Sequence, residues 1–177
     1  MYANIQKVLE KFISKKNIFK YGFNFSPMYR RTTGRICEIS DDLHNIKIRI
    51  KLSYKNSNYV GSIFGGSMLS ATDPIFMIQL FNILGDAYIV WDKAAAIRFK
   101  KPARETCFVN FEFTKAEINK IKKDVEANNE IDVIKNIKIT NENESIVFAE
   151  VSKTIYVADK IFYKEKMKSK KLKLKSN

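Results

Sequence analysis

Hydrophobic and polar residues alternate strictly in one early stretch of the chain. Over residues 46–52, three isoleucines and a leucine are separated by two lysines and an arginine. A period of two is typical of a β-strand with one buried and one solvent-exposed face. A looser alternation covers residues 32–40, and the polar run 41–45 between the two segments predicts a hairpin connection.

The pattern changes at residues 67–84, where apolar side chains surround a helical wheel almost completely. A helix that is apolar on nearly all sides is a buried helix. Gly85 follows as the expected helix stop. A shorter amphipathic helix is predicted at residues 4–13.

Four more strand-like segments follow the long helix. They are residues 88–100, 106–113, 131–140 and 145–157, with a helical crossing at 116–128. A long apolar helix in a chain otherwise made of antiparallel strands predicts a curved sheet wrapped around that helix. We therefore expect an α+β protein with the hotdog fold, formed as one domain over residues 1–159.

Composition supports a single globular domain. The chain has 177 residues, of which 45% are hydrophobic, enough for a sizeable core. Cys37 and Cys107 lie on separate predicted strands without metal-type spacing, and the start of the chain lacks a secretory pattern, so we expect a reduced, cytoplasmic setting and no metal. The longest apolar run, residues 75–84, is too short to span a bilayer, which predicts no transmembrane segment.

The net charge of +13 is concentrated at the C-terminus. Residues 160–177 contain eight lysines and one glutamate, and we expect a flexible, solvated tail. Weak attraction to phosphates or anionic lipids is an alternative, with a nucleic-acid-associated protein as a third functional class. Because the tail shows no positioned element that would read bases, we predict no specific nucleic-acid partner.

Candidate chemistry lies between the second strand and the long helix. Asn58, Gly61 and the pair Gly65-Gly66 precede the helix, and Asp73 follows seven residues after Gly66. Two glycines at a helix start permit close backbone approach. The unpaired amides of the first turn can receive an anion or a polarised carbonyl oxygen.

These residues resemble the active-site window of hotdog-fold acyl-CoA thioesterases of the phenylacetic-acid-pathway type. The matching positions are Asn58, Gly61, Phe64-Gly65-Gly66 and Asp73. The runs 61–67, 71–74 and 88–94, with the strand end 97–104, are similar to a bacterial domain-of-unknown-function family of hotdog proteins labelled as thioesterases. The resemblance covers roughly residues 29–157.

The resemblance implies a role for each matching residue. The amide of Gly66, with Gly65, would polarise a thioester carbonyl, and Asp73 would act as general base or nucleophile. Asn58 would orient the water or the carbonyl. Gly61 and Phe64 would lie against the substrate. No cofactor is implied, because coenzyme A enters as part of the substrate.

The resemblance also implies partners. The substrate would be an acyl-CoA or an acyl-carrier thioester, and the protein a homodimer or homotetramer in which Asp73 faces the Gly66 of another copy. Lys100, Lys101 and Arg104 would meet the phosphates of coenzyme A, although solvated strand-end charges explain them equally well.

Other interpretations of the same residues stay open. Asp73-Pro74 is also the pattern of a helix cap, and Asp73 is alternatively paired with a buried polar group. Asn58 suits a loop turn. Phe64 replaces the histidine of the better-known thioesterases and cannot hydrogen-bond, so a non-catalytic acyl-CoA-binding or regulatory protein is the alternative function.

Two further features are less informative. His44, the only histidine, lies in a polar turn, where a histidine-dependent nucleophile is not expected. Within a predicted strand, Trp91 and Lys93 share one face and Asp92 the other, which favours an interface or a buried ion pair over catalysis.

Overall fold

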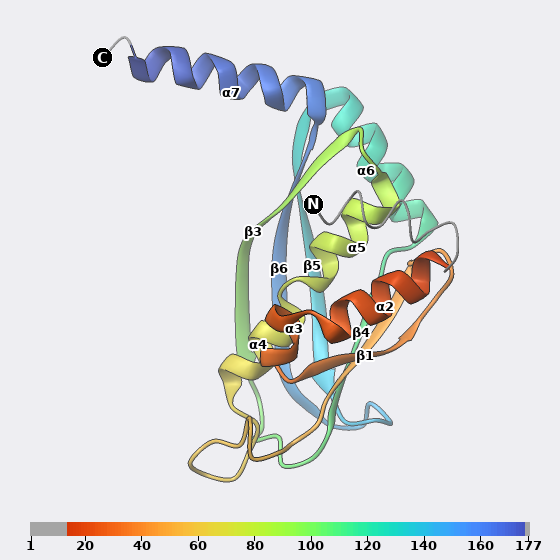
Figure 1. Ribbon diagram of the computed structural model, residues 1–177, viewed down its shortest axis with the longest axis vertical. Helices are drawn as coiled ribbons and strands as arrows, with labels where there is room; N and C mark the ends of the chain where they lie inside the picture. The colour runs from red at the N-terminus through yellow and green to blue at the C-terminus, as the bar shows by residue number, and fades with distance from the viewer. Residues whose placement is uncertain (1–13, 176–177) are drawn as a thin grey trace.

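The computed structural model describes residues 14–175, so the helix expected at residues 4–13 lies outside the described residues. Six strands form one antiparallel sheet in the order β1-β2-β4-β5-β6-β3. They are β1 (Gly34–Ile39), β2 (Asn45–Ile50), β3 (Tyr88–Phe99), β4 (Cys107–Glu112), β5 (Glu130–Thr140) and β6 (Val147–Asp159). All six correspond to strand segments predicted from the sequence (Figure 1).

The apolar helix consists of two segments, α4 (Gly65–Thr72) and α5 (Ile75–Leu84). The break falls at Asp73-Pro74, because proline lacks the amide that would continue the helix. On α5, Ile75, Phe76 and Leu80 are fully buried. The Phe76 ring meets the ring of Phe111 edge-on, with 4.9 Å between centroids. The sheet curves around this helix, which confirms the predicted hotdog fold.

Taken together, α4 and α5 also match a membrane-spanning helix in length and composition. The stretch Gly65–Leu84 has a mean hydropathy of 1.2, and half of it is buried inside the protein. Among the described residues it is the one helix that passes this test. Its place as the central helix of the sheet accounts for its apolar character without a membrane.

Two N-terminal helices for which the sequence analysis made no prediction cover the β1 edge of the sheet. They are α2 (Lys15–Phe25) and α3 (Pro27–Arg31). The side-chain amide of Asn24 donates to the carbonyl oxygen of Ile36 and accepts from its backbone N–H, both at 2.9 Å. Asn24 therefore pairs with β1 as a neighbouring strand would, and this edge is partly closed.

The crossing between β4 and β5 is the expected helix, α6 (Lys115–Asn128). Thr114 and Glu117 form a capping box at its start, each side chain bonding the backbone N–H of the other. Its buried side chains are Ile118, Ile121 and Val125.

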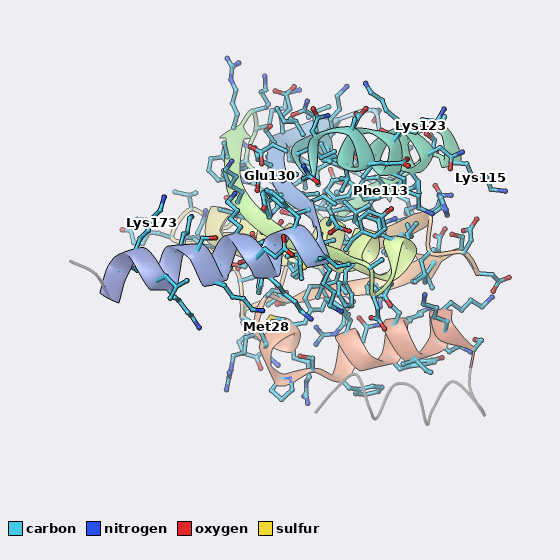
Figure 2. All side chains as sticks on the ribbon, turned by 90° about the horizontal axis from the view of Figure 1, so that it is seen from above. Met28, Phe113, Lys115, Lys123, Glu130 and Lys173 are labelled. Atoms are coloured by element: carbon cyan, nitrogen blue, oxygen red, sulfur yellow. The ribbon has the colours of Figure 1, made fainter. Side chains whose placement is uncertain are left out.

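The lysine-rich segment forms a helix, α7 (Lys160–Lys175), where the sequence analysis expected a flexible tail. Asp159 accepts the backbone N–H groups of Ile161 and Phe162, both at 2.9 Å, and so caps the helix start. Lys166 bonds Glu130 near the base of the helix. Lysine and leucine are good helix formers, and this cap supplies the missing start signal. Beyond its base, α7 projects away from the sheet, with Lys173 toward its free end (Figures 1 and 2).

The outer half of α7 contributes little to stability. Residues 168–174 are exposed, so deletion of 168–177 should change the free energy of unfolding by less than about 0.5 kcal/mol in urea denaturation. Deletion from residue 160 also removes the Lys166–Glu130 pair and should lower stability measurably. If the two truncations lowered the free energy of unfolding equally, the base of α7 would contribute no more to stability than its outer half, which would contradict this prediction.

Candidate functional site

The start of α4 presents free backbone amides. Its N-cap residue, Phe64, provides no side-chain cap, and no described residue accepts a hydrogen bond from the amides of Gly65 or Gly66. A Cβ at Gly65 would lie 2.4 Å from the ring of Phe99, and one at Gly66 would lie 2.3 Å from the ring of Phe64. The close aromatic packing therefore favours glycine at both positions. The two amides, at the positive end of the helix dipole, suit an anion or a polarised carbonyl oxygen.

A cavity of about 370 Å³ adjoins this helix start. It brings together four residues predicted for the site, Asn58, Gly65, Lys100 and Lys101. The rest of its lining is largely apolar: Val60, Ile63, Met68, Phe99, Pro102 and Ala103, with Ser62. An apolar cavity beside free amides has the character of a small-molecule site.

Asn58 uses its side chain within its own loop. Its Oδ1 accepts from the amides of Val60 at 3.1 Å and Ser62 at 3.0 Å, and its Nδ2 donates to the Ser62 hydroxyl at 2.9 Å. Gly61 completes the turn with a φ of 72°. The loop-turn interpretation describes this geometry, so Asn58 shapes the cavity wall.

Asp73 lies at the break between α4 and α5. Its side chain does not cap α5. Instead, Oδ1 accepts a hydrogen bond from Lys153 Nζ at 2.7 Å, which is the paired arrangement left open as the third interpretation. The side chain is 53% exposed. Gly66 lies on the same helix face but about 10 Å away along the axis, so the two do not converge within one chain.

Lys153 is the central residue of this charged group. Its side chain is 1% exposed, and its Nζ lies between Asp73 and Asp92. The Nζ is 3.0 Å from Asp92 Oδ1, but that contact lacks the geometry of a directed hydrogen bond. Burial raises the pKa of Asp92, whereas Lys153 lowers it and the Asp73 carboxylate raises it. The network holds one buried cation against two carboxylates.

Lys153 was not among the predicted site residues, although the sequence carries a signal for it. On β6 the inward positions Ala149, Val151, Ile155 and Val157 are buried and apolar, and Lys153 occupies the inward position between them. A lysine on the apolar face of an alternating strand requires a partner. Asp92 forms an ion pair with the buried Lys153, which is one of the two arrangements, interface or buried ion pair, that the sequence favoured there.

Other predicted residues lie apart from this network. Lys100 pairs with Glu150 at 2.9 Å, while Lys101 and Arg104 are exposed. The ring of His44 contacts the backbone carbonyl of Phe113 at the end of β4.

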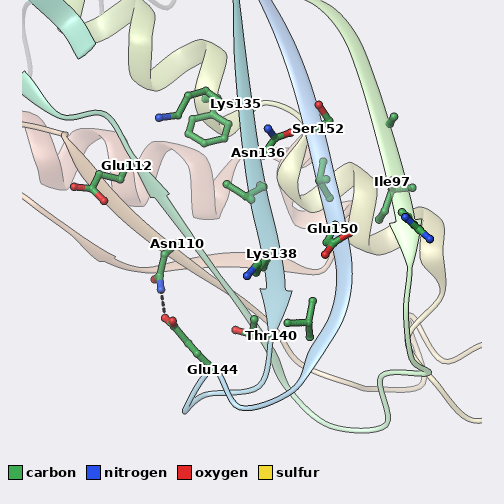
Figure 3. A pocket seen from close by; sticks show the side chains of 16 residues that line it. Ile97, Asn110, Glu112, Lys135, Asn136, Lys138, Thr140, Glu144, Glu150 and Ser152 are labelled. Atoms are coloured by element: carbon green, nitrogen blue, oxygen red, sulfur yellow. Dashed lines mark hydrogen bonds between the residues drawn. The ribbon is translucent and has the colours of Figure 1, made fainter. Parts of the chain in front are cut away.

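A larger cavity, of about 780 Å³, lies elsewhere and includes none of the predicted site residues. It opens where β4 and β5 separate, beside Asn110 and Lys138 (Figure 3). The two strands are joined by the single register pair Phe108–Thr140. Both signs of charge line it, including Lys138 and Glu144, so its chemistry is mixed.

The six-stranded antiparallel sheet around a central helix defines this chain as a hotdog-fold protein. More narrowly, the chain belongs to the family Domain of unknown function (DUF4442), which matches residues 15–157. The sequence matches no curated protein.

Several solved structures share the fold. A Pseudomonas aeruginosa protein of unknown function, described as a probable thioesterase, has a TM-score of 0.72 at 16% identity, covering 81% of this chain and 95% of its own. A Chlorobaculum tepidum protein of unknown function has a TM-score of 0.63 at 12% identity, covering 88% and 94%. A Haemophilus influenzae thioesterase has a TM-score of 0.52 at 12% identity, covering 90% and 91%. At these identities the likeness establishes the fold.

Proposed function

We propose that this protein hydrolyses an acyl thioester carried by coenzyme A or by an acyl-carrier protein. The observation that carries the proposal is the carboxylate of Asp73. Buried Lys153 holds its Oδ1, and no described residue bonds its Oδ2. One carboxylate oxygen is thus fixed and the other is open to a water molecule. A fold shared with thioesterases supports the same assignment.

In this mechanism Asp73 takes a proton from water as the water oxygen attacks the thioester carbonyl carbon. Negative charge then develops on the carbonyl oxygen, where the amides of Gly65 and Gly66 from a second copy of the chain would stabilise it. Preorganised donors of this kind contribute about 3 kcal/mol each. Collapse of the intermediate breaks the carbon–sulfur bond, and the proton passes to the departing thiolate.

The open edge of the sheet supports a homo-oligomer. Asn24 partly covers the β1 edge, but the 12-residue strand β3 pairs with β6 on one side only. Its Trp91 and Phe99 side chains are each 54% exposed. A long edge strand with exposed aromatic side chains suits pairing with a second copy. Because Asp92 lies on β3, such pairing would place the Asp73 network beside the other protomer.

Turnover of a thioester panel tests the proposal. Purified protein should release free thiol from acyl-CoA substrates of different chain length, detected with a thiol reagent, faster than buffer alone. The same panel loaded on an acyl-carrier protein identifies the carrier. Absence of thiol release from every substrate would overturn the hydrolase assignment.

A second candidate function is binding of an acyl thioester without turnover, favoured by Phe64. Its ring is 58% exposed and lies beside Gly66, where the resembling thioesterases carry a histidine. Calorimetric binding of an acyl-CoA that the protein leaves intact would establish this function in place of hydrolysis.

Complementation between two inactive variants tests whether the site is shared between protomers. Asp73→Asn removes the base. Gly66→Pro removes the amide at a first-turn helix position that suits the proline backbone, and the 58% exposed ring of Phe64 has to turn aside to admit its Cβ. Neither homodimer should hydrolyse thioester. Random mixing in a dimer should restore about a quarter of the wild-type activity, because half of the dimers contain one intact site.

Mixed samples that stay as inactive as the separate variants would contradict a site that combines Asp73 of one copy with Gly66 of another. Size-exclusion chromatography with light scattering confirms that both variants assemble, and far-UV circular dichroism confirms that both fold.

A further inference from the structure

A second cavity, of about 680 Å³, is lined by six cationic side chains and by no acidic one. They come from α3, β1, β2 and the loop after β2: Arg30, Arg31, Arg35, Arg49, Lys51 and Lys55. Its volume lies in the range of small-molecule sites. None of these six residues takes part in an ion pair with a described carboxylate.

The sheet register concentrates this charge. Arg35 on β1 stands directly opposite Arg49 on β2, and like charges in direct cross-strand register repel each other. Farther along the same two strands, Lys47 is paired with Glu38 at 3.7 Å. The sequence thus provides a carboxylate for one cation of this hairpin and none for the two arginines. An external anion would relieve their repulsion.

The side chains in the cavity indicate what kind of anion it would bind. Arginine presents a planar fork of donors that matches phosphate oxygens in a bidentate manner. Six cations in one cavity exceed what a single phosphate group needs. Tyr54 also lines the cavity and is 89% exposed. Lys55 Nζ lies over one face of its ring, 5.6 Å from the centroid, and the other face can stack on a planar base.

We infer that this cavity binds a nucleotide that carries at least two phosphate groups. Two kinds of ligand contain such a nucleotide. One is the nucleotide end of coenzyme A, in which case the cavity would hold the substrate of the proposed function. The other is a free nucleotide acting apart from the reaction. Since binding is measured with free coenzyme A and with ATP, the test does not depend on thioester hydrolysis.

Charge-neutralising variants test the inference. Arg35→Gln/Arg49→Gln should weaken binding of ATP or coenzyme A by at least tenfold in calorimetry at about 0.15 M salt. The matched control is Lys115→Gln/Lys123→Gln, which removes the same charge from exposed positions on α6 (Figure 2). The control should stay within twofold of wild type. An equal loss in both variants, or no binding to wild type, would overturn the site.

Stability provides a second readout. Without ligand, Arg35→Gln/Arg49→Gln should melt at or above the wild-type temperature, since opposed charges are removed, which also verifies folding. Nucleotide should raise the melting temperature of wild type and not of this variant. A variant that gains the same thermal shift with nucleotide would contradict binding at these arginines.

Further binding measurements identify the ligand. Tyr54→Ala should weaken ATP binding but leave pyrophosphate binding unchanged, as expected for base stacking. Tighter binding of coenzyme A than of ATP assigns the site to the substrate, and the reverse order assigns it to a free nucleotide. Binding of a single-stranded RNA oligonucleotide at least a hundredfold tighter than either, with steep salt dependence, would replace the nucleotide site with a nucleic-acid surface.

Discussion

Asp73→Asn is expected to reduce thioester hydrolysis by a factor of about 100 or more, because a positioned general base contributes on this scale. Asparagine keeps the size of the side chain and can still accept a hydrogen bond from Lys153, but it cannot take a proton from water. The rate constant kcat should fall in a steady-state thiol-release assay, while the circular dichroism spectrum and the oligomeric state stay as in wild type.

Asp92→Asn is the matched control for this variant. It also leaves Lys153 with a single carboxylate, but it retains the carboxylate of Asp73, whose open oxygen is the proposed base. We expect a loss of less than tenfold. His44→Ala should leave kcat unchanged, because the ring contacts the Phe113 carbonyl and not the Asp73 network. Equal losses in Asp73→Asn and Asp92→Asn would mean that the network matters as a structural unit and that Asp73 is not the base.

Lys153→Met is expected to lower the free energy of unfolding by about 3 kcal/mol, because removing one partner leaves a buried charge uncompensated. The cost should fall mainly on Asp92, whose side chain is 23% exposed, since the 53% exposed Asp73 is better solvated. Denaturation in urea at neutral pH measures the effect. Lys93→Met is the matched control, because its pair with Asp132 is largely exposed; it should cost less than about 1 kcal/mol.

The pH dependence of Lys153→Met should identify Asp92 as the source. Burial already raises the pKa of Asp92, and Lys153 lowers it, so loss of the lysine should raise this pKa further. A raised carboxyl pKa in the folded state means that stability falls as pH rises above the unfolded value, about 3.9. The loss in the free energy of unfolding caused by Lys153→Met should therefore be small at acid pH and grow toward neutral pH.

Adding Asp92→Asn to Lys153→Met should recover much of the lost stability, because the uncompensated charge is then gone. If Lys153→Met alone lowers the free energy of unfolding by less than about 1 kcal/mol at neutral pH, the network lies in a well-solvated environment.

Local pattern was sufficient for much of the fold. Strict alternation marked β2, and an apolar helical wheel marked a single helix, which the structure divides at Asp73-Pro74 into α4 and α5. Each of these signals depends on residues within a few positions of one another, because helix and strand periods are short. The glycine pair was recognisable for the same reason, since free amides at a helix start follow from the backbone alone.

The lysine-rich segment forms helix α7, and its two contacts at the base differ in how far apart the bonded residues lie in the sequence. Its lysines suggested a solvated, flexible segment, but Asp159 caps the helix and Glu130 binds Lys166 from β5. The cap was visible in the sequence. The Glu130 contact was not, because it joins residues 36 positions apart.

Short-range pattern was enough to place the strands, the buried helix and the amides at its start, whereas the packing of the whole chain sets which charges meet. Asp73 and Lys153 are 80 positions apart, and Asp92 reaches the same ammonium group from a strand whose register shifts between Asp92 and Ala94. Arg35 faces Arg49 because of the β1–β2 register. Such contacts depend on sheet order, register and bulges, which arise when the whole chain packs and leave no short-range period in the sequence.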